Sequence, residues 1–214
     1  CYILMDNMEE AKKAINNAKK IDESNIFVIL LEARLFQKEG CAEKAIELLE
    51  NQAIVEREPA QRLFRKGRAY DQLGRIEEAK DCYEQALKCD SKTYDAKLCL
   101  LNHLIIDDPK EAEKQIENLR GKLRGKRKYI LKNIEARYVG YQKGDEEKAI
   151  EILESVPQNA RDRQWYAVKQ QLLENCVLKH TQFQRSILVQ MYSEELKTLD
   201  STIEKKYGDR SLSD

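Results

Sequence analysis

The stretch LFRKGRAYDQLGRIEEAKDCYEQAL, residues 63–87, spaces its small and aromatic side chains in a way that predicts two packed helices. Gly67 and Tyr70 lie three residues apart, so they share one face of a first helix. Ala79 and Tyr83 share a face of a second helix by the same rule. Small residues allow two helix backbones to approach closely, and aromatic side chains fill the space beside them. We therefore expect an antiparallel helix pair in this stretch.

The same spacing recurs elsewhere in the chain at a fixed period. Ala11, Ala45 and Ala79 follow one another at intervals of 34 residues, and Gly40 and Gly74 are separated by the same interval. A period of this length is typical of stacked helical repeats, in which each unit buries one face against its neighbours. The composition agrees, because the 214 residues include 8 glycines and 3 prolines, with 42% hydrophobic and 36% charged residues. The sequence therefore predicts an all-α fold.

The best copy of this pattern resembles the motif of the tetratricopeptide repeat family. Its motif positions are Leu63, Gly67, Tyr70, Gly74, Ala79, Tyr83 and Ala86. Lys66 and Ser91 stand where the family usually has leucine and proline. The resemblance implies a right-handed α-solenoid of antiparallel helix pairs, that is, a TPR-like superhelix with capping helices at its C-terminal end.

The weaker copies keep the register of the best one and indicate how the chain is organised. A truncated first unit carries Ala11 and Ile15, and a later unit carries Ala136 and Ala149. We expect a repeat array over residues 1–157, capping helices over 158–207 and a frayed tail over 208–214. The expected units of the array lie near residues 26–59, 60–92, 93–122 and 130–157.

The resemblance also implies where a partner binds, because members of the family hold a peptide or a partner protein along a groove formed by the first helix of each pair. Transferring the groove positions to this sequence gives Phe27, Leu30, Arg34, Gln37, Arg65, Arg68, Gln72, Tyr94, Lys97, Tyr138 and Tyr141. Core packing is an equal alternative for the apolar members. Arg34 and Arg68 share one register, and together with Arg65 and Lys97 they favour an acidic partner.

A basic patch interrupts the balanced charge of the chain, which has 38 Lys and Arg residues and 38 Asp and Glu residues. The segment LRGKLRGKRKYILK, residues 119–132, contains no acidic residue. The cations of this basic patch are Arg120, Lys122, Arg124, Lys126, Arg127, Lys128 and Lys132. Three interpretations remain open: a solvated edge between helices, a surface for an acidic protein, and a surface for nucleic acid. The first is the commonest role of such runs, and Tyr129 is the one nearby aromatic residue that could stack on a base.

No catalytic site, metal site or cofactor is predicted. His103 and His180 are the only histidines, and they fall in different units without a serine or cysteine placed as a nucleophile. A zinc site can be drawn from Cys82, Cys89, Cys99 and His103, but cysteines on a helix more often serve as small hydrophobic residues. We therefore expect a protein–protein interaction module that is not an enzyme.

The remaining features concern location and context. The six cysteines include no CxxC pair, so reduced thiols and a cytoplasmic location are expected, and the apolar runs are too short to span a membrane. Because the chain begins with Cys1, we expect a piece of a longer protein. Degenerate repeats followed by long helices are similar to scaffold subunits of assemblies such as the anaphase-promoting complex, and to the sensor portion of bacterial signal-transduction ATPases. Packing against a second copy, or against the rest of a longer parent chain, also stays open.

Overall fold

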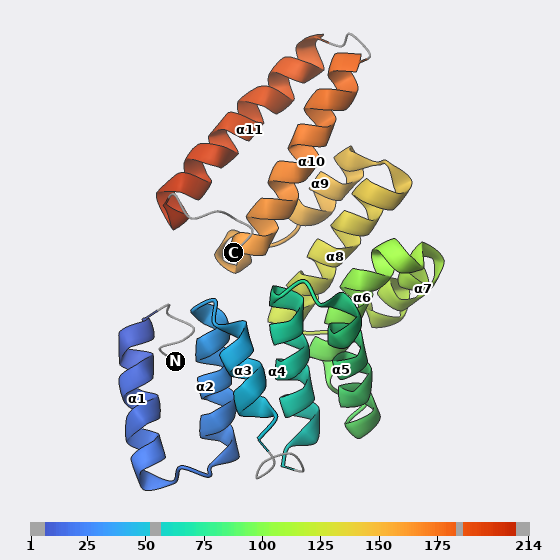
Figure 1. The fold of residues 1–214 in the computed structure, drawn as a ribbon. Helices are drawn as coiled ribbons and strands as arrows, with labels where there is room; N and C mark the ends of the chain where they lie inside the picture. Colours follow the sequence, from blue (N-terminus) through green and yellow to red (C-terminus); the bar gives the residue numbers. More distant parts are fainter. Residues whose placement is uncertain (1–6, 52–56, 183–185, 209–214) are drawn as a thin grey trace. The chain divides into compact units, whose positions relative to one another are not determined.

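The computed structural model describes residues 7–51, 57–182 and 186–208, and within these ranges the regular structure is helical, without a β-strand (Figure 1). The helices are α1 (Met8–Ile21), α2 (Ile26–Lys38), α3 (Ala42–Leu49), α4 (Pro59–Gln72), α5 (Ile76–Cys89), α6 (Tyr94–Asp107), α7 (Pro109–Leu119), α8 (Lys126–Lys143), α9 (Glu146–Glu154), the 3-10 helix η3 (Gln158–Ala160), α10 (Arg163–Gln182) and α11 (Ser186–Tyr207). The expected all-α class is confirmed. Most of the expected tail, residues 209–214, lies outside the described ranges. None of the described helices has the length and apolar character that a membrane span requires.

The chain divides into two compact units, residues 1–100 and 101–214, and the boundary falls inside α6. In the first unit each helix from α1 to α5 packs on the next one. In the second unit α7 packs on α8, α8 packs on α9 and α10, and α10 also packs on α9 and α11. Packing of consecutive helices in this way is the arrangement of a tetratricopeptide-like solenoid. The boundary that the sequence suggests at residue 157 stays a prediction.

The turns between paired helices repeat with the period of the sequence. The amide of Cys41 donates to the carbonyl of Phe36 over 2.8 Å, and the amide of Arg75 donates to the carbonyl of Tyr70 over 3.0 Å. Both partners of the second bond lie 34 residues after those of the first, so the two bonds close the same kind of turn. Gly74 lies inside the second turn with a φ of 69°, a left-handed conformation that glycine adopts without steric cost. The period read from the sequence is therefore also a period of the backbone.

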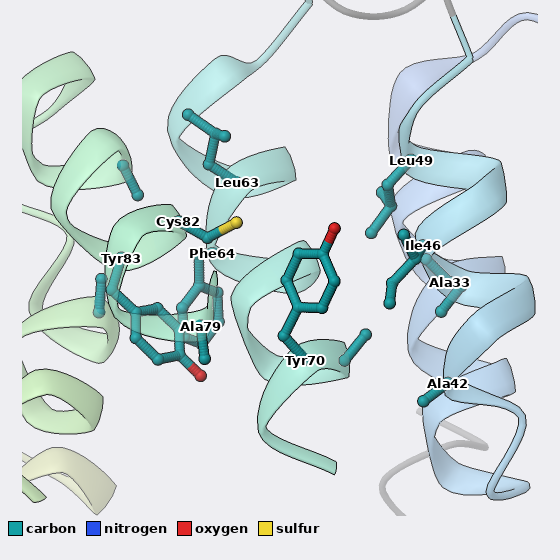
Figure 2. Close-up of a cluster of buried hydrophobic side chains, with 14 residues drawn as sticks. Ala33, Ala42, Ile46, Leu49, Leu63, Phe64, Tyr70, Ala79, Cys82 and Tyr83 are labelled. Carbon is teal, nitrogen blue, oxygen red and sulfur yellow. The ribbon is translucent and has the colours of Figure 1, made fainter. Parts of the chain in front are cut away.

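The core of the first unit lies around α4, which stands between α3 and α5 (Figure 2). Tyr70 projects from α4 toward Ile46 of α3. On the other side Tyr83 of α5 packs beside Phe64, with the ring centroids 6.1 Å apart. A Cβ atom added to Gly67 would lie 2.6 Å from Cε1 of Tyr83. The close approach of two helices, predicted from their small residues, is confirmed.

The second unit is organised around α10. Trp165 and Leu172 of this helix are buried, and Trp165 donates a hydrogen bond from Nε1 to the Leu153 carbonyl at the end of α9, over 2.9 Å. Gly140 of α8 faces Leu172 so closely that a Cβ atom would not fit between them. Small residues therefore set the helix spacing in this unit as they do in the first.

The last helix, α11, is buried along part of its length. Leu199 and Ile203 are buried, whereas Ile187 and Met191 are 75% and 56% exposed. All four recur at helical spacing in the sequence and suggest one apolar face. Within the described residues, the part of this apolar face that carries Leu199 and Ile203 is covered, and the part that carries Ile187 and Met191 is exposed.

Candidate functional site

Two glutamines fasten α2 to α4 in the first unit. Nε2 of Gln37 donates to the carbonyl of Arg65 over 2.7 Å, and Nε2 of Gln72 donates to the carbonyl of Gln37 over 2.8 Å. Gln37 is buried and Gln72 is exposed. Both were candidates for the groove, and the structure shows that each amide group already bonds to the backbone of the neighbouring helix. Their side chains therefore fix the geometry of the seam between α2 and α4.

Three arginines gather at this seam, and we call Arg34, Arg65 and Arg68 the arginine triad. Arg34 lies one turn before Gln37 on α2, and Arg68 lies one turn after Arg65 on α4, so the glutamine bonds bring the two turns together. Burial, together with the positive charges of Arg34 and Arg68, lowers the pKa of Arg65 to about 10. Burial alone would lower the pKa of Arg68, but Cys99, Tyr83 and Asp71 raise it above its usual value, and Arg68 forms a hydrogen bond with Cys99.

An apolar surface continues from the triad along α2. Phe27 and Leu31 are 62% and 46% exposed, and they lie one turn apart. At about 100° per residue, Phe27, Leu31 and Arg34 fall on one stripe of the helix. Leu30, the other apolar groove candidate on α2, is half-buried and packs against Ile26 and Ile29. The exposed part of α2 is thus apolar at its start and cationic at its end.

The groove candidates on α6 belong to the first unit. Tyr94 and Lys97 are half-buried, and Nζ of Lys97 lies 5.4 Å from the centroid of the Tyr94 ring. A cation over an aromatic face in this way is a favourable contact of about 0.5–1 kcal/mol at an exposed site. The pair places a positive charge and a polar ring at the first turn of the helix.

The groove candidates in the second unit have different surroundings. Tyr138 is 7% exposed and borders a small cavity of about 90 Å³ that residues of α7, α8 and α9 line. Nζ of Lys143 lies 5.3 Å from its ring centroid, and burial together with the Glu113 carboxylate raises the pKa of Tyr138. Tyr141 is 44% exposed, with Cζ of Arg137 5.9 Å from its ring centroid. Tyr141 is therefore accessible and Tyr138 is largely enclosed.

The basic patch spans the connection from α7 to α8 and the first turns of α8. Arg120 forms an ion pair with Glu135 at 2.5 Å, and Nζ of Lys126 lies 3.8 Å from a carboxylate oxygen of Asp162. Arg124 is exposed. Two further cations of the patch bond to polar side chains, Lys122 to Asn118 and Lys132 to Ser155. Part of the patch is therefore paired within the second unit.

A hollow on the first unit was not singled out in the sequence. It has a volume of about 400 Å³ and is lined by Glu43, Ile46, Glu47, Glu50, Asn51 and Arg75. The spacing of its three glutamates, four and three residues apart, is the signal that places them on one face of α3. Glu50 forms an ion pair with Lys66 at 2.7 Å, so the hollow is partly neutralised.

Within the described ranges, no three His, Cys, Asp or Glu side chains come together as a metal site would require. Burial raises the pKa of Cys82 and of Cys99, which favours the protonated thiol. His180 is buried in the second unit, where its ring stacks on Tyr192 with centroids 5.4 Å apart and Nε2 lies 3.5 Å from Glu147. These contacts are those of a packed side chain that joins helices.

The comparison with known proteins bears on the first unit. No curated protein matches the sequence. The sequence model of the tetratricopeptide repeat family matches residues 60–93. This segment includes nearly all of α4 and the whole of α5. This segment contains the close contact between Gly67 and Tyr83, and repeats of this family are in general protein–protein interaction modules without catalytic activity. The helix pair formed by α4 and α5 is therefore a tetratricopeptide repeat.

Proposed function

We propose that the first unit binds a partner protein or a peptide along the face formed by α2, α4 and the part of α6 that belongs to this unit. The arginine triad is the observation that carries the proposal. The positive charges of Arg34 and Arg68 act on Arg65 at this seam, and Phe27 is exposed on the same stripe of α2 as Arg34. Arginine and aromatic side chains are the residues that most often dominate protein–protein interfaces. An acidic partner fits the charge of this face.

Two contexts suit such a module, a scaffold subunit of an assembly and the sensor portion of a larger signalling protein. Both use helical repeats to recognise a protein, and neither requires a reaction centre. We place the protein in the cytoplasm, since its described cysteines Cys41, Cys82, Cys89, Cys99 and Cys176 are all unpaired thiols. Association with a second copy, or with the rest of a longer parent chain, is supported by the exposed Ile187 and Met191 of α11.

Site-specific photocrosslinking in cells tests the binding face. A photoreactive amino acid is placed at Phe27 or Arg65 on the proposed face, and at Asn17 or Lys88 as controls exposed elsewhere on the unit. We expect crosslinks to another protein from the first two positions and none from the controls. Crosslinks from the control positions alone, or from neither set in the intact protein, would contradict the proposal.

A second candidate function is binding of nucleic acid or of an acidic partner through the basic patch. Arg124 and Lys128 favour it, because both are exposed near the start of α8, whose first turn carries no acidic residue. Phosphate contacts would make the logarithm of affinity fall linearly with the logarithm of salt concentration. Titration of RNA and DNA at two salt concentrations therefore tests this candidate, and absence of binding at low salt rules out nucleic acid.

A further inference from the structure

We propose that two copies of the chain associate, with the basic patch of one copy docked on the acidic hollow of the other. The acidic hollow is the one lined by Glu43, Ile46, Glu47, Glu50, Asn51 and Arg75, and the basic patch is the set of seven cations within residues 120–132. The inference goes beyond the proposed function, because partner binding along α2, α4 and α6 uses other residues.

The first step concerns the charge of the acidic hollow. Glu43 and Glu47 lie one turn apart on α3, and both are exposed. Among the described residues, neither carboxylate has an ion-pair or hydrogen-bond partner. The other charged residues of the hollow are already paired, Glu50 with Lys66 and Arg75 with Glu78. Two negative charges of the hollow are therefore left for a cationic partner.

The second step concerns the occupant. Arg124 and Lys128 of the basic patch are exposed, and within the described ranges neither side chain is paired. Helix α8 begins between them, at Lys126, and its first turn has no acidic residue and no side-chain cap from the described part of the chain. Because a helix N-terminus presents amide donors and favours negative charge, the two cations and this helix end attract carboxylates together. The chain as a whole has a net charge of zero, so two copies can approach without overall repulsion.

The third step concerns the fit between the two surfaces. The hollow has a volume of about 400 Å³, and Ile46 adds an apolar side chain to its acidic lining. Long cationic side chains lay their aliphatic stems on apolar surface while the charged end reaches an acid, so an arginine or lysine suits this lining. A nucleic acid would complement the basic patch and be repelled by the hollow. A second copy of the chain complements both surfaces.

Sedimentation velocity of the full chain, over a series of protein concentrations, tests the proposal. The average sedimentation coefficient should rise with concentration at low salt and rise much less at about 0.5 M salt, because ions screen exposed charges. Glu43→Lys, Glu47→Lys should weaken self-association about tenfold or more, and so should Arg124→Glu, Lys128→Glu. An equimolar mixture of these two variants should associate again, because the reversed hollow of one complements the reversed patch of the other.

The control is Glu84→Lys, Glu151→Lys, which reverses the same charges at exposed positions of α5 and α9. It should leave self-association within about twofold of the parent value. A parent protein that stays monomeric at every concentration, an equal loss in the control, a loss in one reversed variant alone, or a mixture no more associated than its components would each overturn the inference. The proposed function would stand in each case, because crosslinks from Phe27 or Arg65 to a different protein do not depend on self-association.

Discussion

Gly67 of α4 and Tyr83 of α5 are in contact with no room for a side chain between them. A Cβ atom on Gly67 would lie 2.6 Å from Cε1 and 2.8 Å from Cδ1 of the tyrosine ring. Tyr83 is fully buried, and its hydroxyl donates to Asp71, so the ring is held at both ends. Glycine at position 67 is therefore a steric requirement of this helix pair.

Gly67→Ala should destabilise the protein. Overpacking of this kind costs about 1–3 kcal/mol, and the better helix propensity of alanine offsets up to about 1 kcal/mol of that cost. Chemical denaturation followed by circular dichroism measures the free energy of unfolding. Gln61→Ala, at an exposed position of the same helix, is the control and should change it by less than about 0.5 kcal/mol. A Gly67→Ala protein as stable as its parent would show that the two helices have room to separate.

This helix pair could be predicted from the sequence because residues three and four apart meet on one helix face whatever the rest of the chain does. The surroundings of Tyr138 could not. Assigning groove residues at a fixed period along the sequence assumes that all repeat units are identical. In the structure, however, the ring of Tyr138 is buried and lies near Glu113 and Lys143. The contacts between neighbouring helix pairs depend on how far the sequence of each pair differs from the repeat motif, and the motif alone does not specify them.

The role of Gln37 and Gln72 was equally hidden in the sequence. An amide that bonds to the backbone of a neighbouring helix and an amide that faces a ligand have the same sequence signature, since both occupy the first helix of a pair. In the structure both amides donate to backbone carbonyls, those of Arg65 and Gln37, and so belong to the first kind. The arginines of the seam, in contrast, were recognisable because Arg34 and Arg68 repeat with the period of the fold.

Tyr83→Phe should change how stability depends on pH. Burial raises the pKa of Tyr83, with Cys99 and Asp71 acting in the same direction. Above about pH 10 the tyrosine of the unfolded chain loses its proton while the folded protein keeps it, so stability falls as pH rises. Phenylalanine removes this contribution, and the loss of the hydrogen bond to Asp71 costs about 1 kcal/mol at neutral pH.

Denaturation at a series of pH values compares Tyr83→Phe with the parent. Tyr141→Phe is the control, because Tyr141 is 44% exposed. The difference in stability between Tyr83→Phe and the parent should shrink above about pH 10. An unchanged difference across that range would show that Tyr83 ionises as easily in the folded protein as in the unfolded chain.

Lys169→Met should loosen α11. Lys169 is 8% exposed, and its Nζ lies 2.5 Å from Glu154 of α9 and 2.8 Å from Glu195 of α11. Because the two glutamate side chains are 40% and 44% exposed, solvent screens the pairs, and we expect a loss of about 1–2 kcal/mol. Amide hydrogen exchange should accelerate in α11 and remain unchanged in α4 and α5.

The same lysine makes a pH prediction. Hydrogen bonds to Glu154 and Glu195 raise the pKa of Lys169 above 10.5 despite the opposing effect of burial. Its stabilising contribution is therefore present below pH 10.5 and is lost as pH rises through the higher pKa of the folded state. Lys197→Met, at an exposed position of α11, is the control and should show neither effect. Equal exchange rates in α11 of Lys169→Met and of the parent would contradict the role of this lysine.

Arg34→Gln should make the protein more stable and a poorer binder of acidic peptides. Burial and the charges of Arg34 and Arg68 lower the pKa of Arg65 from 12.5 to about 10, so charged Arg65 destabilises the folded state at neutral pH. Arg34 contributes part of that cost through repulsion, and its removal should raise the free energy of unfolding by about 0.3–1 kcal/mol. Thermal unfolding at neutral pH measures the gain, with Lys44→Gln as the control for the change in net charge. A lower melting temperature in Arg34→Gln would mean that the stem of Arg34 packs more favourably than its charge repels, and the triad would then be a structural contact instead of a surface held ready for a partner.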